Sequence, residues 1–167
     1  MAKEETEKKS TSGKVRIEDN IIYWDYENEN LLQININEIV VIGEYTNSDG
    51  PYFDDWFLTF VSKDGQWQSI PRYAANIDNL TTYLSTKFDQ DFNTTNLANS
   101  TEWKSSILYP THLKDKMLFK LKPSSTYKTP KTLLDKILSS VGFGNFDTTQ
   151  DIGLTEDVKN ELANASR

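Results

Sequence analysis

Short apolar runs alternate with turn-forming polar residues along the first half of the chain. The runs at 14–17, 21–26 and 31–36 place apolar side chains at every second position, whereas "IVVIGEY" at 39–45 is apolar on both faces. Alternation is typical of a half-buried strand, and a continuous apolar run indicates a strand buried on both faces. We therefore expect antiparallel strands between residues 14 and 70, the one at 39–45 being the most buried.

The stretch "WFLTFVSKDGQW" at 56–67 predicts a β-hairpin that turns at Asp64-Gly65. An Asp-Gly pair favours a two-residue type I′ turn, because both central positions need a positive φ. Such a turn places Ser62 opposite Trp67. The side chains that would then share one buried face are Trp56, Leu58, Phe60 and Trp67.

After Pro71 the apolar spacing changes from two to three and four residues, which predicts an amphipathic helix near 74–88. Two further strands are expected at 103–109 and 116–122. A second helix is expected near 130–141, where Thr and Pro begin the apolar stripe and Gly ends it. A weaker helix is expected at 155–165.

These elements predict an α+β fold in which antiparallel strands form a curved sheet or partial barrel closed by an amphipathic helix, followed by a β–α extension. We expect three regions along the chain. Residues 1–13 are a charged, disordered tail. Residues 14–142 form a single α+β domain, and residues 143–167 a linker with a short C-terminal helix.

Composition narrows the classes of function. The 167 residues carry a net charge of -7 and include one histidine. The chain has no cysteine, which excludes disulfides and thiolate metal sites. No apolar run approaches the roughly 20 residues of a membrane span. The N-terminus lacks the apolar stretch of a signal peptide, so we expect a cytoplasmic protein. The acidic charge argues against nucleic acid as the partner of the whole chain.

Catalytic signatures are scarce. His112 is the only histidine, and the chain has neither a G-x-S-x-G nucleophile elbow nor a phosphate-binding P-loop. We therefore expect no enzyme activity, no cofactor and no metal. Residues 145–156 match the ligand spacing of a calcium-binding loop, but Asn145 replaces the first Asp and Gln150 stands where that loop needs Gly. A polar connector is the other interpretation of this segment.

The segment 44–57 combines acidic and aromatic residues around a turn. Adjacent strand residues point to opposite faces, so Asp54 and Asp55 do not converge on one metal or substrate atom. We interpret the segment as a surface for a basic protein partner. The candidate partner-binding residues are Glu44, Tyr45, Asp49, Tyr52, Phe53, Asp54 and Asp55.

From residue 14 to 88 the expected order is short antiparallel strands, a Trp-bearing hairpin with "DGQW", and a helix in "IPRYAANIDNLTTYL". This order resembles pleckstrin-homology-like domains, in which a curved sheet is closed at one end by a helix. The resemblance implies a non-catalytic scaffold that presents loops to partners. The turns "EDN" and "ENEN" are acidic where phosphoinositide-binding members carry basic loops.

The leading hypothesis is a soluble, non-catalytic binding protein, for instance an immunity or inhibitor protein directed against a basic toxin domain. Two alternatives remain open. The lysine-rich segment 104–136, with a net charge of +6, could bind an anionic lipid or nucleic-acid surface. Alternatively, scattered carboxylates could form an enzyme site.

Overall fold

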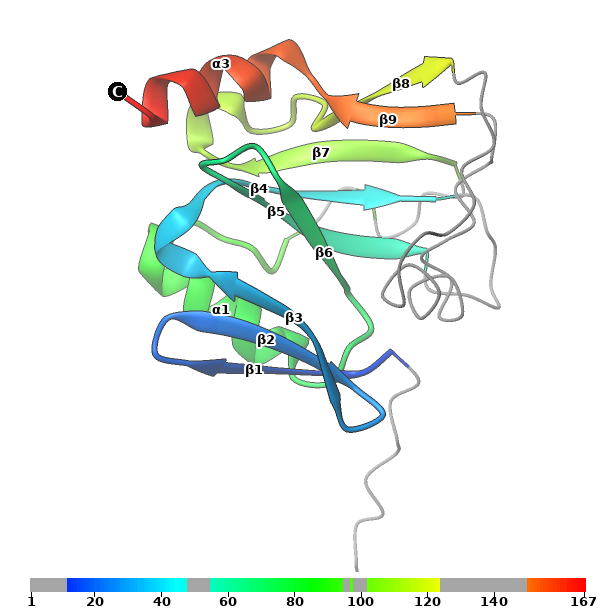
Figure 1. The fold of residues 1–167 in the computed structure, drawn as a ribbon, viewed down its shortest axis with the longest axis vertical. Coiled ribbons are helices and arrows are strands. Elements are labelled where there is room, and N and C mark those ends of the chain that lie inside the picture. Colours follow the sequence, from blue (N-terminus) through cyan, green and yellow to red (C-terminus); the bar gives the residue numbers. More distant parts are fainter. Residues whose placement is uncertain (1–11, 48–54, 95–96, 98–101, 124–149) are drawn as a thin grey trace, which may run out of the picture.

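The computed structural model describes residues 12–47, 55–94, 97, 102–123 and 150–167. This part of the chain is α+β. It contains antiparallel strands in three sheets and two α-helices, and its sheets do not close into a barrel. The expected α+β class is therefore confirmed, and the sheets are stacked as tiers in Figure 1.

The first sheet has the order β1-β2-β3 and contains β1 (Lys14–Glu18), β2 (Ile21–Tyr26) and β3 (Glu29–Asn35). Its hairpins turn at Asp19-Asn20 and Glu27-Asn28, and all four of these residues have φ between 49° and 71°. Two positive φ values in succession are the signature of a type I′ turn, whose twist matches that of the strands.

The central sheet has the order β6-β5-β4-β7, with antiparallel pairing throughout. A 3₁₀ turn, η1 (Ile36–Glu38), leads from β3 into this sheet. Its strands confirm the expected positions: β4 (Ile39–Thr46), β5 (Trp56–Ser62), β6 (Trp67–Pro71) and β7 (Lys104–Tyr109). Every residue of β4 is buried, as the apolar run predicted.

The third sheet pairs β8 (Phe119–Pro123) with β9 (Gln150–Leu154), and α3 (Glu156–Ala165) follows directly. This arrangement corrects the expectation that residues 143–167 are a linker with a helix, because the segment contributes a paired strand. It also places five of the twelve residues of 145–156 in β9. The calcium-loop interpretation itself stays a prediction, because residues 145–149 lie outside the described residues.

Helix α1 (Ile77–Phe88) confirms the first predicted helix, and α3 confirms the last. The helix expected at 130–141 lies outside the described residues. The strand expected at 116–122 begins later, at Phe119, because η2 (Thr111–Leu113) and a turn precede it. Neither of the two described α-helices has the length and apolar character needed to cross a bilayer.

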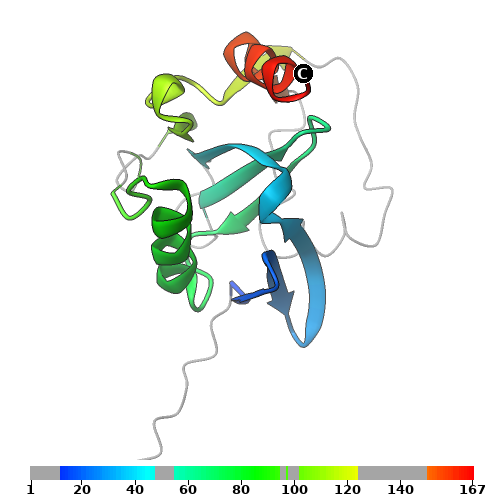
Figure 2. The same ribbon diagram turned by 90° about the vertical axis from the view of Figure 1, so that its left-hand side faces the viewer.

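The central sheet separates two apolar cores. Figure 2 shows α1 and the first sheet flanking one side of it, while α3 lies beyond the other side. The first core contains Val15, Ile22, Trp24, Leu32, Ile34, Ile36, Ile39, Ile42, Leu58, Phe60, Ile70, Ala74, Leu80, Leu84, Phe92 and Leu108. The second core contains Val40, Val41, Tyr45, Phe57, Val61, Ile107, Leu113, Leu118, Phe119, Leu154 and Val158.

The β5–β6 hairpin differs from the predicted one by one residue of register. Trp67 pairs with Val61, not with Ser62. The loop has three residues closed by Ser62 and Gln66, and Gly65 alone adopts a positive φ, of 80°. This is the type I turn followed by a left-handed glycine that also joins hairpin strands, so Asp64 needs no positive φ.

The shifted register moves Trp67 to the opposite face of the sheet. Its side chain is 38% exposed and contacts the ring of Phe119, with ring centroids 5.5 Å apart. The expectation that Trp67 is buried with Leu58 and Phe60 is therefore wrong. Both faces of β5 are nevertheless buried, because Phe57 and Val61 belong to the second core.

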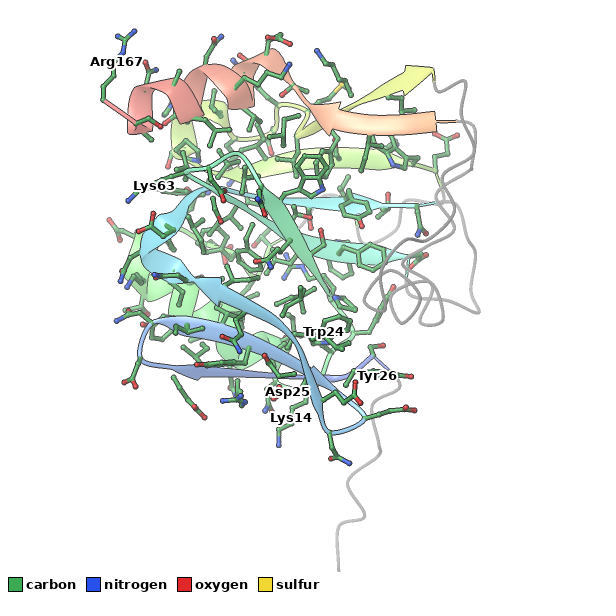
Figure 3. The ribbon with its side chains drawn as sticks, in the orientation of Figure 1. Lys14, Trp24, Asp25, Tyr26, Lys63 and Arg167 are labelled. Carbon is green, nitrogen blue, oxygen red and sulfur yellow. The ribbon has the colours of Figure 1, made fainter. Side chains whose placement is uncertain are left out.

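Ser12 and Gly13 belong to the fold and not to the tail expected at 1–13. The Ser12 carbonyl accepts a hydrogen bond from Trp24 Nε1 at 2.9 Å. Gly13 has φ of 77°, and a Cβ there would lie 2.5 Å from the Trp24 indole nitrogen. Figure 3 shows Trp24 on the first sheet, far from Lys63 at the tip of the β5–β6 hairpin. The remaining residues of the expected tail lie outside the described part.

Ion pairs join α3 to the segment 116–120, which includes the start of β8. Lys116 pairs with Asp157 at 2.9 Å, and Lys120 pairs with Glu156 at 2.7 Å. These side chains are solvent-exposed, so each pair adds little stability on its own and weakens as salt is added. The apolar anchor of the helix is Val158, which is fully buried.

Phe60→Ala should destabilise the protein by about 3–5 kcal/mol, because a fully buried phenylalanine loses its contacts and leaves a cavity. Trp67→Ala should cost less than half as much, since that side chain is 38% exposed. Urea unfolding of both variants measures the difference. Equal costs would contradict the observed register.

Glu156 makes the stability of the fold depend on pH in the acidic range. Its hydrogen bonds with Lys120 and Lys159 lower the pKa of Glu156 from 4.5 to about 2. A carboxyl with a lowered pKa stabilises the fold above pH 4.5, and this contribution disappears as pH falls towards 2. Glu156→Gln should therefore flatten the dependence of Tm on pH between 4.5 and 2. Glu29→Gln is the control. Identical Tm-against-pH profiles for the wild type and Glu156→Gln would contradict a stabilising role for the hydrogen bonds of Glu156 with Lys120 and Lys159.

Candidate protein-binding surface

Two of the predicted partner-binding residues lie in the interior. Glu44 is 0% exposed and Tyr45 is 3% exposed, both on β4, an inner strand of the central sheet. Tyr45 belongs to the second core, where its ring stacks on Phe57 with centroids 4.9 Å apart. The structure therefore does not place Glu44 or Tyr45 on an exposed surface.

Glu44 is paired with a buried arginine that follows β6. Arg72 Nη2 lies 3.5 Å from Glu44 Oε2, and the arginine side chain is 6% exposed. The same Nη2 donates a hydrogen bond to the Phe92 carbonyl at 3.2 Å. Burial lowers the pKa of the Arg72 guanidinium, because desolvation penalises the charged form more than Glu44 favours it.

Arg72 is only partly satisfied by this arrangement. Its Nε is buried and has no hydrogen-bond acceptor among the described residues. An unmade hydrogen bond of this kind costs about 1–3 kcal/mol, more for a charged group. The pair therefore does not stabilise the fold strongly, and its effect lies in what it holds in place.

Trp56 lies directly over this pair. Its Nε1 donates a hydrogen bond to Glu44 Oε2 at 2.9 Å, and the Arg72 guanidinium carbon is 4.9 Å from the centre of its ring. One carboxylate oxygen thus fixes the indole, and a cation–π contact adds to it. Trp56 is half-buried, so its other side is available at the surface.

Tyr73 and Asp55 lie on the solvent side of Trp56. The Tyr73 hydroxyl donates to Asp55 Oδ1 at 2.8 Å. The Tyr73 ring meets the Trp56 ring edge-on, with centroids 6.3 Å apart, and the side chain is 48% exposed. We call Asp55, Trp56 and Tyr73 the acidic–aromatic patch.

The other four predicted residues lie outside the described part of the chain: Asp49, Tyr52, Phe53 and Asp54. Of the seven candidates, the structure brings Asp55 to the surface and Glu44 beneath it, at the same end of the central sheet. The link between the two is Trp56, which follows Asp55 in the sequence.

The sequence itself contains a signal that Glu44 and Arg72 are paired. A glutamate in a run that is apolar on both faces must be buried, and a buried carboxylate needs a cation. Arg72 is the one positive residue between Lys63 and Lys87. Tyr73 carried no signal, because its exposure depends on how the chain leaves β6.

The arrangement combines a buried ion pair with aromatic side chains held at the surface. The Glu44 carboxylate is already paired with Arg72 and Trp56, so it is not positioned as a free base. His112 is exposed in η2, where its Nε2 lies 2.8 Å from Glu161 Oε2 of α3. Tyrosine and tryptophan held rigidly at a surface are the residue types that most often dominate binding energy.

Arg72→Met should destabilise the protein by about 3–5 kcal/mol, because it leaves the Glu44 carboxylate buried without its cation. The double variant Arg72→Met/Glu44→Gln removes both charges at similar volume and should cost less than Arg72→Met alone. Chemical unfolding of the two single variants and the double variant gives the coupling energy. Additive costs would mean that the two side chains act independently.

Comparisons of the chain with protein-family models, with curated proteins and with solved structures found no match. The function of the acidic–aromatic patch is therefore inferred from its own geometry and charge.

Proposed function

We propose that the chain is a non-catalytic binding protein that uses the acidic–aromatic patch to hold a basic partner protein. The supporting observation is Tyr73, an exposed aromatic side chain that is fixed at both its ring and its hydroxyl. Its hydroxyl donates to Asp55 and its ring packs against Trp56. A side chain fixed before binding loses little conformational entropy when the partner arrives.

The charge of the region supports a basic partner. The described residues from 12 to 94 include twelve acidic and five basic side chains, a net charge of -7. The described residues from 102 onward include six acidic and seven basic side chains. An acidic region of this kind speeds the encounter with a basic protein and repels acidic ones.

The alternative partner, an anionic lipid or nucleic-acid surface bound by lysines 104–136, has less support. Lys116 and Lys120 are engaged by Asp157 and Glu156 of α3. Binding phosphates there would require breaking these pairs or bringing acidic side chains against the ligand. The other lysines of this segment offer no arrangement among the described residues that favours an anionic surface.

Two narrower proposals follow from the same surface. One is inhibition: the partner is a basic toxin domain, and the chain acts as its immunity or inhibitor protein. The other concerns the scaffold: six antiparallel strands followed by α1 form a pleckstrin-homology-like unit, with the loops at one end of the central sheet presented to the partner. Both are tested once the partner is identified by affinity capture from a native lysate.

Asp55→Lys should slow association with the captured partner at low salt, and the difference from wild type should fade by about 1 M salt, where the Debye length is about 3 Å. The matched control is Glu38→Lys, which changes net charge equally but precedes β4, at its opposite end from Asp55. Stopped-flow association rates measured against ionic strength separate the two variants. Equal slowing by both variants would mean that only overall charge matters.

Tyr73→Ala should instead speed dissociation of the complex about tenfold or more, because an aromatic anchor contributes mainly to the lifetime of a complex. Tyr73→Phe keeps the ring and loses only the hydrogen bond to Asp55, so its effect should be smaller. Surface plasmon resonance measures both dissociation rates. Unchanged dissociation in Tyr73→Ala would exclude the patch as the contact.

A further inference from the structure

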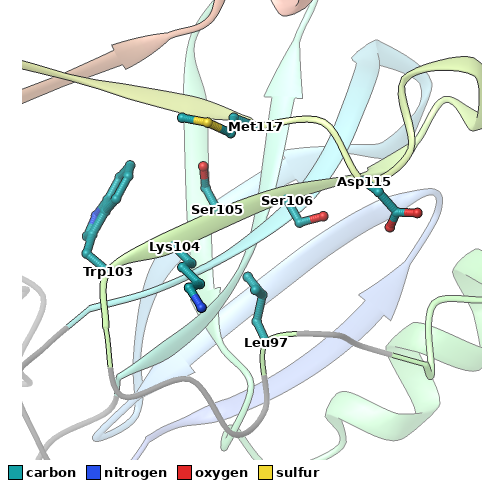
Figure 4. A pocket seen from close by; sticks show the side chains of 7 residues that line it. All are labelled: Leu97, Trp103, Lys104, Ser105, Ser106, Asp115 and Met117. Atoms are coloured by element: carbon teal, nitrogen blue, oxygen red, sulfur yellow. The ribbon is translucent and has the colours of Figure 1, made fainter.

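A pocket of about 360 Å³ lies beside β7 and shares no residue with the acidic–aromatic patch. Its lining is formed by Leu97, Trp103, Lys104, Ser105, Ser106, Asp115 and Met117 (Figure 4). Four of these residues are consecutive, and successive strand residues point to opposite faces. A cavity touched by both faces of one strand lies along the edge of that strand, and β7 is an edge strand of the central sheet.

The main chain of β7 is turned outward at this edge. Ile107 donates its N–H to the Lys116 carbonyl at 2.8 Å and accepts from the Asp115 N–H at 2.9 Å. These bonds lie on the side away from β4, and the direction of main-chain groups alternates along a strand. The N–H and carbonyl of Ser105, two positions away, therefore also point outward.

The neighbouring segment leaves this edge uncovered at Ser105. Between the described residues of that segment and Ser105, the hydrogen bonds use only the Ser105 hydroxyl, which accepts from the Phe119 N–H at 3.1 Å and donates to the Phe119 carbonyl at 3.4 Å. Among the described residues, the Ser105 main chain forms no hydrogen bond with the segment 115–119. The structure thus leaves outward donor and acceptor groups beside a cavity.

The two sides of the pocket differ in chemistry. Figure 4 shows Trp103 and Ser105 projecting to the side where Met117 lies, and Lys104 and Ser106 projecting to the side of Leu97. Met117 is 55% exposed, so the first side offers uncovered apolar surface. Lys104 forms no ion pair with a described residue, and Asp115 lies at the far end of the pocket from it.

We propose that this pocket binds a short extended peptide segment of a partner protein, which adds to β7 as a further strand. Strand addition uses main-chain hydrogen bonds for affinity and side-chain pockets for specificity. Because side chains alternate along the added strand, an apolar residue faces Trp103 and Met117 and the next residue, an acidic one, faces Lys104. The volume lies at the lower end of the usual range for ligand sites, which fits a few residues and not a helix.

A library of random linear heptapeptides displayed on phage tests the proposal. The full chain is the bait, and peptides that also bind Met117→Glu are removed. Enriched peptides should carry an apolar residue beside an acidic one. A synthetic copy should bind at least tenfold more weakly to Lys104→Glu and equally well to Asp55→Lys, which alters the other surface.

Two measurements test the strand geometry. N-methylation of one peptide amide that faces β7 should weaken binding at least tenfold, because it removes a main-chain donor. The Ser105 amide should exchange its hydrogen rapidly in the protein alone and slowly with the peptide bound, as followed by NMR.

Three outcomes would overturn the proposal. The first is no enrichment beyond the Met117→Glu background. The second is a Ser105 amide already protected in the protein alone at every concentration, which would mean that the chain itself fills the edge. The third is protection that grows with protein concentration, which would identify a second copy of this chain as the occupant.

Discussion

The fold depends on one constraint: the central sheet is covered on both faces. Strands β4 and β5 send alternate side chains into two different cores, so neither face tolerates contact with water. A sheet with apolar side chains on both faces needs helices or other strands packed against each face. The first sheet and α1 cover one face, and the β8–β9 pair with α3 covers the other. The distant C-terminal segment is therefore part of the core.

The same constraint creates the charged centre beneath the candidate surface. A glutamate in β4 has no route to solvent, so it requires a partner brought in by another segment. Arg72 provides the charge and Trp56 provides a hydrogen bond. A buried pair of this kind adds little net stability, but it fixes the geometry of whatever lies above it. Tyr73 is held in place because Trp56 is held in place.

Local sequence patterns predicted most of the helices and strands, but not how the strands pair or which side chains meet in the cores. Alternation and turn chemistry located β1 to β6, and the three-and-four spacing located α1 and α3. The register of the β5–β6 hairpin was wrong, because Asp-Gly fits both a two-residue turn and the end of a three-residue loop. That shift of one residue in the register decides on which face of the sheet Trp67 lies.

The candidate site shows the same division. Asp55 was predicted from composition and is at the surface, whereas Tyr45 has an equally suitable side chain and is in the core. The difference depends on what covers β4, and the covering segment is more than sixty residues away in sequence. Arg72 and Tyr73 follow β6, and their positions depend on how the chain crosses to α1. No local sequence pattern encodes what covers β4 or how the chain crosses from β6 to α1.

The order in which the two cores are completed has a consequence for synthesis. Among the described residues, the buried members of the first core end at Leu108, whereas the second core also includes Leu154 and Val158. The fifty positions that separate Leu108 from Val158 take roughly 3–10 s to translate at about 5–20 residues per second. Until Leu154 and Val158 have been made, the apolar sheet face around Val41, Phe57 and Val61 lacks part of its cover. A ribosome that stalls in this window would leave a partly covered sheet, and exposed apolar surface of this kind is prone to aggregate unless a chaperone shields it.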